Sequence, residues 1–201
     1  MLNGGECVKE QRTVGQYRAI DLSLFALMLI LSETVIVSAA VKWFPNEPYT
    51  VSAVAAVTAI VMMRWGLWAA LHAVLGGIVF CLVSHGTLAQ FAIYCIGNLF
   101  GLTGLAWIRA LGAERLREDS FKSLAYGFTV LLCMQLGRGL VSLLFGTKPA
   151  VAAGFVTTDV ISCLFTLLII WIVRRLDGVF EDQIHYLRRV NKEREEEKGG
   201  F

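Results

Sequence analysis

The stretch LLCMQLGRGLVSLLFG, residues 131–146, decides how the rest of the chain must be interpreted. It is apolar enough for the middle of a lipid bilayer, yet it contains an arginine, Arg138. A charge inside a membrane costs several kcal/mol, so such a side chain usually faces a protein interior, a partner or a polar cavity. The stretch therefore predicts a membrane helix that turns one polar side away from lipid.

The composition of the whole chain supports a membrane location. Of its 201 residues, 56% are hydrophobic and 17% are charged, and the mean hydropathy is +0.64. Soluble domains average about 45–50% apolar and about 25% charged residues. The charges gather at the N-terminus, around residues 109–122 and after residue 174. Apolar runs of about 20 residues, the length needed to cross a bilayer, lie between these clusters. We therefore predict an all-α integral membrane protein.

Helix-breaking segments divide the apolar part of the chain into six predicted membrane helices. The runs cover residues 19–44, 49–63, 67–83, 89–111, 123–145 and 150–173. Cytoplasmic loops collect Lys and Arg. With both termini inside, the outer side carries only Lys42 and Lys148, whereas five crossings would put the basic segment 109–122 outside. We therefore predict a cytoplasmic segment 1–18, a six-helix domain 19–175 and a charged cytoplasmic tail 176–201.

Polar side chains recur on one face of several of these helices, in what we predict to be the outer half of the membrane. Residues three or four apart share a helix face. The stripes are Gln90, Tyr94 and Asn98; Gln135, Arg138 and Ser142; and Asp159, Ser162 and Thr166, with Glu33 at a similar depth in the first helix. One interpretation is a binding cavity open to the outside. The other is a set of helix–helix hydrogen bonds, with Arg138 paired to Asp159 or to Glu33.

Several kinds of catalytic and binding motif are absent from the sequence. The chain has no phosphate-binding Gly-rich loop with GKS or GKT, no GxSxG and no HExxH. His72 and His85 have no carboxylate at metal-ligand spacing, and the 5 cysteines show no CxxC pattern. We therefore predict no enzyme activity, no metal, no cofactor and no nucleic-acid partner. Transport against a gradient would need another protein or an ion gradient to supply the energy.

Four segments resemble the substrate-binding (S) component of energy-coupling factor transporters. They are WFPNEPYTVSAVAAV (43–57), MMRWGLWAALHAVLGGIVF (62–80), IYCIGNLFGLTG (93–104) and KPAVAAGFVTTDVIS (148–162). The resemblance covers about residues 20–175 and implies six helices with both ends inside. It also implies a vitamin-like ligand bound near the outer face, with Asn46 and Tyr49 in a loop that covers the ligand. Where the family often has two alanines four apart for docking its coupling protein, this chain has Ala19 and Ser23.

The leading hypothesis is a membrane subunit that binds a small water-soluble micronutrient outside the cell. The resemblance implies that a transmembrane coupling protein and two ATPase subunits drive uptake, in the plasma membrane of a bacterium. The candidate substrate-binding residues are Glu33, Trp43, Asn46, Tyr49, Gln90, Tyr94, Asn98, Gln135, Arg138, Asp159 and Ser162. Two alternatives stay open: a structural or assembly protein of the envelope, and a small ion-coupled transporter in which Glu33 or Asp159 carries a proton.

Overall fold

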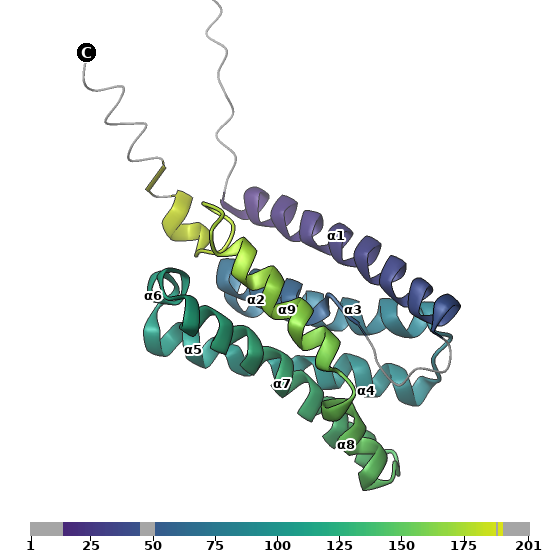
Figure 1. Cartoon of the computed structure of the whole chain (residues 1–201). Helices are drawn as coiled ribbons and strands as arrows, with labels where there is room; N and C mark the ends of the chain where they lie inside the picture. The colour runs from purple at the N-terminus through teal and green to yellow at the C-terminus, as the bar shows by residue number, and fades with distance from the viewer. Residues whose placement is uncertain (1–13, 45–50, 188, 191–201) are drawn as a thin grey trace, which may run out of the picture.

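All regular elements that the structure describes are helical. The structure is a computed structural model and describes residues 14–44, 51–187 and 189–190. The helices are α1 (Val14–Trp43), α2 (Val54–Trp65), η1 (Gly66–Trp68), α3 (Ala69–Val83), α4 (Leu88–Leu99), η2 (Phe100–Gly104), α5 (Leu105–Leu111), α6 (Ala113–Glu118), α7 (Ser120–Leu144), α8 (Pro149–Thr157) and α9 (Val160–Val173). They lie roughly along a common axis, with both ends of the described chain at the same end of the bundle (Figure 1).

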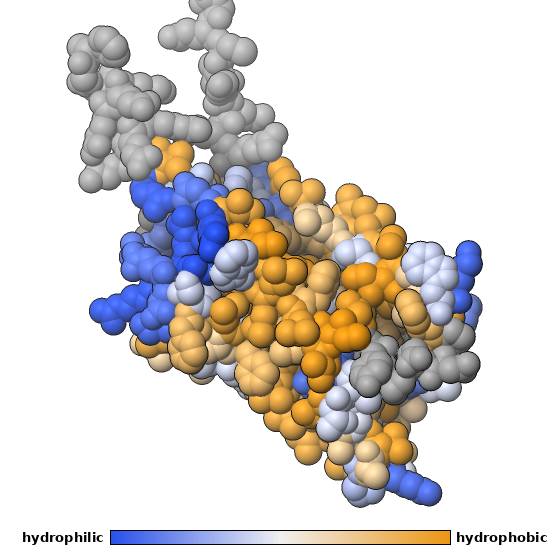
Figure 2. Space-filling model, in the orientation of Figure 1, coloured by the Kyte–Doolittle hydropathy of each residue, from blue (hydrophilic) through white to orange (hydrophobic). Residues whose placement is uncertain are grey.

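Five segments of the described chain are long and apolar enough to cross a membrane. They are Val14–Trp43, Val54–Val83, Leu88–Leu111, Ser120–Leu144 and Pro149–Val173. Large apolar side chains such as Leu31, Val35 and Leu164 are exposed along them. Figure 2 shows a broad apolar surface across the middle of one face, with hydrophilic side chains concentrated at the end where the described chain begins and ends. These features indicate a multi-pass membrane protein, as the composition predicts.

The segment Val54–Val83 is not one straight helix. The chain turns at Gly66, whose φ of 61° lies in the left-handed region that favours glycine. Helix α3 runs back beside α2. The two helices are in close contact, since a Cβ at Gly76 would lie 2.4 Å from a methyl carbon of Val54. Helix α2 has 12 residues, all of them buried. It is about 18 Å long and too short to cross roughly 30 Å of hydrocarbon alone. The number of crossings and their direction therefore stay predictions.

Helix α7, which carries Arg138, packs closely against the helix formed by α4 and η2. A Cβ at Gly97 would lie 2.7 Å from Arg138 Cα, and one at Gly101 would lie 2.6 Å from Met134 Cε. Small residues at such positions let two helices approach until their backbones nearly touch. The glycines therefore place Arg138 directly against the neighbouring helix.

The predicted sixth run, residues 150–173, is interrupted. Helix α8 ends at Thr157 and α9 begins at Val160, and Asp159 stands at the break as the N-cap residue of α9. The two helices meet at an angle (Figure 1). Helix α8 packs on α7 near Gly139, where a Cβ would lie 3.2 Å from the carbonyl oxygen of Ala152. The break therefore brings a carboxylate into the interior beside α7.

The chain does not leave the bundle after α9. Turns occupy residues 174–179, and a helical turn follows at 183–187. Phe180 is fully buried, and its ring lies 6.2 Å from that of Tyr126 in α7. Tyr126 in turn donates a hydrogen bond of 2.8 Å to the carbonyl oxygen of Ala59 in α2. The segment predicted as a charged tail therefore begins with residues that complete the core.

Candidate functional site

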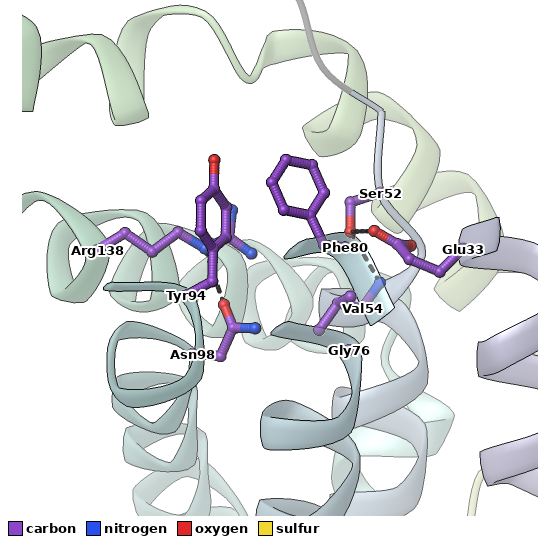
Figure 3. Close-up of a pocket in the computed structure, with 8 residues that line it drawn as sticks. All are labelled: Glu33, Ser52, Val54, Gly76, Phe80, Tyr94, Asn98 and Arg138. Atoms are coloured by element: carbon purple, nitrogen blue, oxygen red, sulfur yellow. Dashed lines mark hydrogen bonds between the residues drawn. The ribbon is translucent and has the colours of Figure 1, made fainter. Parts of the chain in front are cut away.

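A small, partly open cavity lies among the polar stripes. Its walls come from α1, from Ser52 and the first residue of α2, and from α3, α4 and α7 (Figure 3). The lining residues are Glu33, Ser52, Val54, Gly76, Phe80, Tyr94, Asn98 and Arg138. The cavity volume is about 10 Å³. That is room for about one water molecule.

Arg138 forms one wall of this cavity, and its guanidinium is held from two sides. Its Nε donates to the Oδ1 of Asn98 over 2.8 Å, and the cation lies 5.0 Å from the ring centroid of Tyr94. The Nδ2 of Asn98 donates to the carbonyl oxygen of Ala73 over 2.9 Å, which ties α4 to α3. Only 6% of Arg138 is exposed. The arginine that stands out in the sequence therefore faces the interior, as predicted, and its orientation is set by neighbouring helices.

Asp159 pairs with Arg138 but does not line the cavity. Its Oδ2 is 3.6 Å from Arg138 Nη1 and accepts a hydrogen bond of 3.1 Å from Gln135 Nε2. Its Oδ1 accepts one of 2.6 Å from the Ser162 hydroxyl. The predicted Arg138–Asp159 pair is therefore present. A buried charge needs such a counter-charge with further hydrogen bonds. Gln135, Asp159 and Ser162 thus position the guanidinium and do not line the cavity.

Glu33 forms the opposite wall and closes the start of α2. Its Oε2 accepts a hydrogen bond of 2.9 Å from the Ala53 N–H, and its Oε1 accepts one of 2.8 Å from the Ser52 hydroxyl. The N–H of Val54 donates to Ser52 Oγ over 3.2 Å. The first N–H groups of a helix have no partner within it, and the positive end of its dipole favours an anion there. Glu33 is therefore the capping group of a helix that begins inside the bundle.

Two aromatic rings narrow the space between these walls. The ring centroids of Phe80 and Tyr94 are 4.3 Å apart, and Tyr94 also meets Phe155 of α8 edge-on at 6.0 Å. Sequence reasoning did not select Phe80, Phe155 or Ser52. An aromatic residue in an apolar run carries no local signal that separates a cavity wall from ordinary packing. Ser52 becomes visible only once Glu33 is known to lie at the start of α2.

The structure does not bring the other candidates to the cavity. Gln90 is exposed at the start of α4, where its Oε1 accepts a hydrogen bond of 2.7 Å from the Thr87 N–H in a capping box. The Gln90 amide therefore serves the start of α4, and Gln90 does not line the cavity. Trp43 is 68% exposed at the end of α1. Asn46 and Tyr49 lie outside the described residues.

A second buried charge cluster lies at the end of the bundle that carries the arginines. Arg64 Nη2 is 2.7 Å from Asp21 Oδ1, and the indole Nε1 of Trp65 donates to Asp21 Oδ2 over 2.6 Å. Arg64 Nη1 also donates to the carbonyl oxygens of Gly178 and Val179, over 2.6 Å and 2.9 Å. We call these five residues the Arg64 clasp. Sequence reasoning placed Arg64 in a cytoplasmic turn and did not predict its partners.

Neither a metal site nor a known relative adds to this picture. Among the residues that the structure describes, no three His, Cys, Asp or Glu side chains are grouped so that they could hold a metal ion. Comparisons of the chain with protein-family models, with curated proteins and with solved structures find no match.

Proposed function

We propose that the protein is a membrane subunit that binds a small water-soluble compound, of the micronutrient class, between Arg138 and Glu33. The observation that carries the proposal is the convergence of Glu33, Tyr94, Asn98 and Arg138, from three helices, on one small cavity. A cation stands on one wall and a carboxylate on the other (Figure 3). Ligand sites combine an apolar, aromatic lining with a few convergent polar groups, and this cavity has that composition.

Binding requires the cavity to widen. Its volume of about 10 Å³ is far below the several hundred Å³ of small-molecule sites. The Phe80 and Tyr94 rings are its least constrained walls, because they meet through ring contacts and both are only partly buried. A ligand that separates them would gain two apolar ring faces. An anionic group of the ligand would face Arg138, whose guanidinium can donate two parallel hydrogen bonds to a carboxylate or phosphate.

The resemblance to the S component of energy-coupling factor transporters supplies the rest of the proposal. In this scheme the cavity loads from outside a bacterial cell, and release inside is driven by a transmembrane coupling protein with two ATPase subunits. The six crossings and the cytoplasmic placement of both termini belong to the same proposal. The arginines at the end of the bundle opposite the cavity support that orientation, because Lys and Arg collect on the cytoplasmic side.

The direct test is mass spectrometry of compounds extracted from the protein purified from its native membrane. We expect one dominant small molecule at near-equal molar ratio. In Arg138→Ala its occupancy should fall more than about tenfold, because a hydrogen bond to a charged group contributes about 1.5–3 kcal/mol. Arg175→Ala is the matched control, since Arg175 stacks 3.9 Å from the Trp171 ring, remote in sequence from every cavity residue. An unchanged extract from Arg138→Ala would contradict the proposal.

A second candidate function is favoured by the small volume of the cavity. The hydrogen bonds among Arg138, Asn98, Asp159 and Gln135 would then serve only to join α4, α7 and the α8–α9 break, in a structural or assembly protein. The double variant Arg138→Gln with Asp159→Asn separates the two functions. It removes both charges together, so thermal stability in detergent should be closer to wild type than in either single variant. The binding function predicts that ligand is still lost from this variant, whereas the structural function predicts no copurified ligand in any variant.

A further inference from the structure

An apolar groove lies on the lipid-facing side of the bundle, near the end that carries the arginines. Its floor is one face of η2 and α5, and its other side is Leu67 of η1. The lining residues are Leu67, Leu102, Thr103, Leu105, Ala106, Arg109 and Ala110. Its volume is about 590 Å³. Leu102, Ala106 and Ala110 recur every four residues and so share one helix face. The small side chains of the two alanines create the groove, and Leu67, which is 62% exposed, forms its other side.

Arg109 stands at the end of this groove in the last turn of α5. Its side chain is exposed, and it forms no salt bridge within the described part of the chain. Other arginines near this end are engaged: Arg64 pairs with Asp21, and Arg117 with Glu181. A guanidinium remains charged at any ordinary pH. The groove therefore combines an open apolar surface with a permanent positive charge that no described carboxylate neutralises.

We propose that this groove binds one anionic phospholipid. The phosphate would lie on the guanidinium of Arg109, and an acyl chain would follow Leu102 and Ala106 toward the middle of the membrane. From Arg109 to Leu102 the helix rises about 10 Å, so several methylene groups of the chain lie along the floor. Basic pockets between membrane helices at the cytoplasmic side are recognised by anionic lipid headgroups, and each Arg near the surface contributes about fivefold in affinity.

The matching of charge and shape favours a lipid over a protein helix. A partner helix packed here would have to present an acidic side chain to Arg109 at the end of the groove. A phospholipid carries its charge and its hydrocarbon in this order along one molecule, and it is already present at this surface. The inference does not depend on the proposed ligand function, because the groove lies outside the bundle and shares no residue with the cavity.

Native mass spectrometry of the full-length protein in detergent tests the proposal. Phosphatidylglycerol and phosphatidylcholine with identical acyl chains are added in separate titrations. We expect wild type to retain phosphatidylglycerol preferentially as a single bound lipid. Arg109→Gln should weaken that binding about fivefold and leave phosphatidylcholine unchanged. Ala106→Trp should remove the binding of both lipids while Arg109 is retained, and Ala110→Phe fills the same floor if the tryptophan variant does not fold.

Arg115→Gln is the matched control, because Arg115 is an exposed arginine on α6 that does not line the groove. It should bind phosphatidylglycerol as wild type does. Equal losses in Arg109→Gln and Arg115→Gln would show a general charge effect and overturn the site. So would equal retention of the two lipids by wild type, or unchanged binding in both groove-filling variants. Copurification of a protein that protects the groove from phosphatidylglycerol would overturn it as well.

Discussion

At the scale of single residues, the interactions of Arg138 depend on the directions of its N–H donors as well as on its charge. Its Nε meets Asn98, one Nη approaches Asp159, and the plane lies near the Tyr94 ring. Lysine has a compact charge without the planar fork, so it cannot reproduce this arrangement. We expect Arg138→Lys to fold and to weaken ligand binding by roughly tenfold. The measurement is occupancy by extracted ligand, and wild-type occupancy in Arg138→Lys would show that charge alone suffices.

Glu33 gives a prediction about stability. In Glu33→Ala the N–H of Ala53, the N-cap residue of α2, and the Ser52 hydroxyl lose their acceptor inside the bundle. We expect a loss of about 1–3 kcal/mol in the free energy of unfolding, because a buried donor without a partner costs about that much. Glu33→Gln should lose less, since its amide oxygen can still accept from Ala53. Thermal unfolding in detergent measures both variants, and equal stability of Glu33→Ala and wild type would refute the capping role.

At the scale of helices, the contact of α4 with α7 fixes where the cavity residues stand. A Cβ at Gly97 would lie 2.7 Å from backbone atoms of Arg138, so Gly97→Ala must push the helices apart. We expect a destabilisation of about 1–3 kcal/mol and weaker ligand binding, because Arg138 Nε moves away from Asn98. Gly154→Ala in α8 is the control, since a Cβ there meets nothing within 4 Å. Similar losses of stability and of ligand binding in the two variants would mean that the close α4–α7 contact does not position Arg138.

The C-terminal segment gives a prediction about pH. The pKa of Asp177 is lowered by the hydrogen bond that its Oδ1 accepts from Arg117 Nη2 over 2.8 Å. A lowered pKa means that the ionised form stabilises the folded state, so this stabilisation is complete above the ordinary value of 3.8 and is lost as pH falls further. We expect the unfolding temperature to fall below about pH 4, and to fall less in Asp177→Asn. Glu114→Gln, at an exposed carboxylate with no salt bridge among the described residues, should follow wild type.

The element-level predictions succeed where the information is local. The apolar runs 49–63 and 67–83 correspond to α2 and α3, and the turn between the two helices falls at Gly66. The tail is different. The sequence predicts a charged cytoplasmic tail over residues 176–201, yet Phe180 is fully buried and its ring lies beside that of Tyr126. Phe180, Ile184 and Leu187 recur at near-helical spacing, but this spacing does not identify Tyr126 as the residue that Phe180 packs against.

At the scale of the whole molecule, direction in the membrane is the prediction that most needs a measurement. With both ends inside, a cysteine at Lys148 should react with a membrane-impermeant maleimide in intact cells. A cysteine at Arg115 should react only after the cells are permeabilised. Both variants are made in a chain whose natural cysteines are replaced. The opposite labelling pattern would reverse the orientation, and labelling of both in intact cells would show a different number of crossings.

The contacts that hold the helices together are also those that sequence reasoning could not predict. The polar stripes on α4, α7 and α9 predicted a shared interior, and Asn98, Arg138 and Asp159 meet there. Helical periodicity identifies which face of a helix is polar. It does not say which carboxylate pairs with which arginine, or that Asp21 and Arg64 would close around residues 178 and 179. Such pairings depend on how the helices cross, which single-helix patterns do not contain.

The Arg64 clasp has a consequence for the order in which the protein is assembled. Asp21 and Arg64 belong to the first two helices, but the carbonyl groups of Gly178 and Val179 follow the last one. During synthesis the ribosome delivers these acceptors only after every membrane helix has emerged. Until then the Nη1 donors of Arg64 can be satisfied only by water or lipid headgroups. The Arg64 clasp can therefore close only after α9 and the residues that follow it have been synthesised.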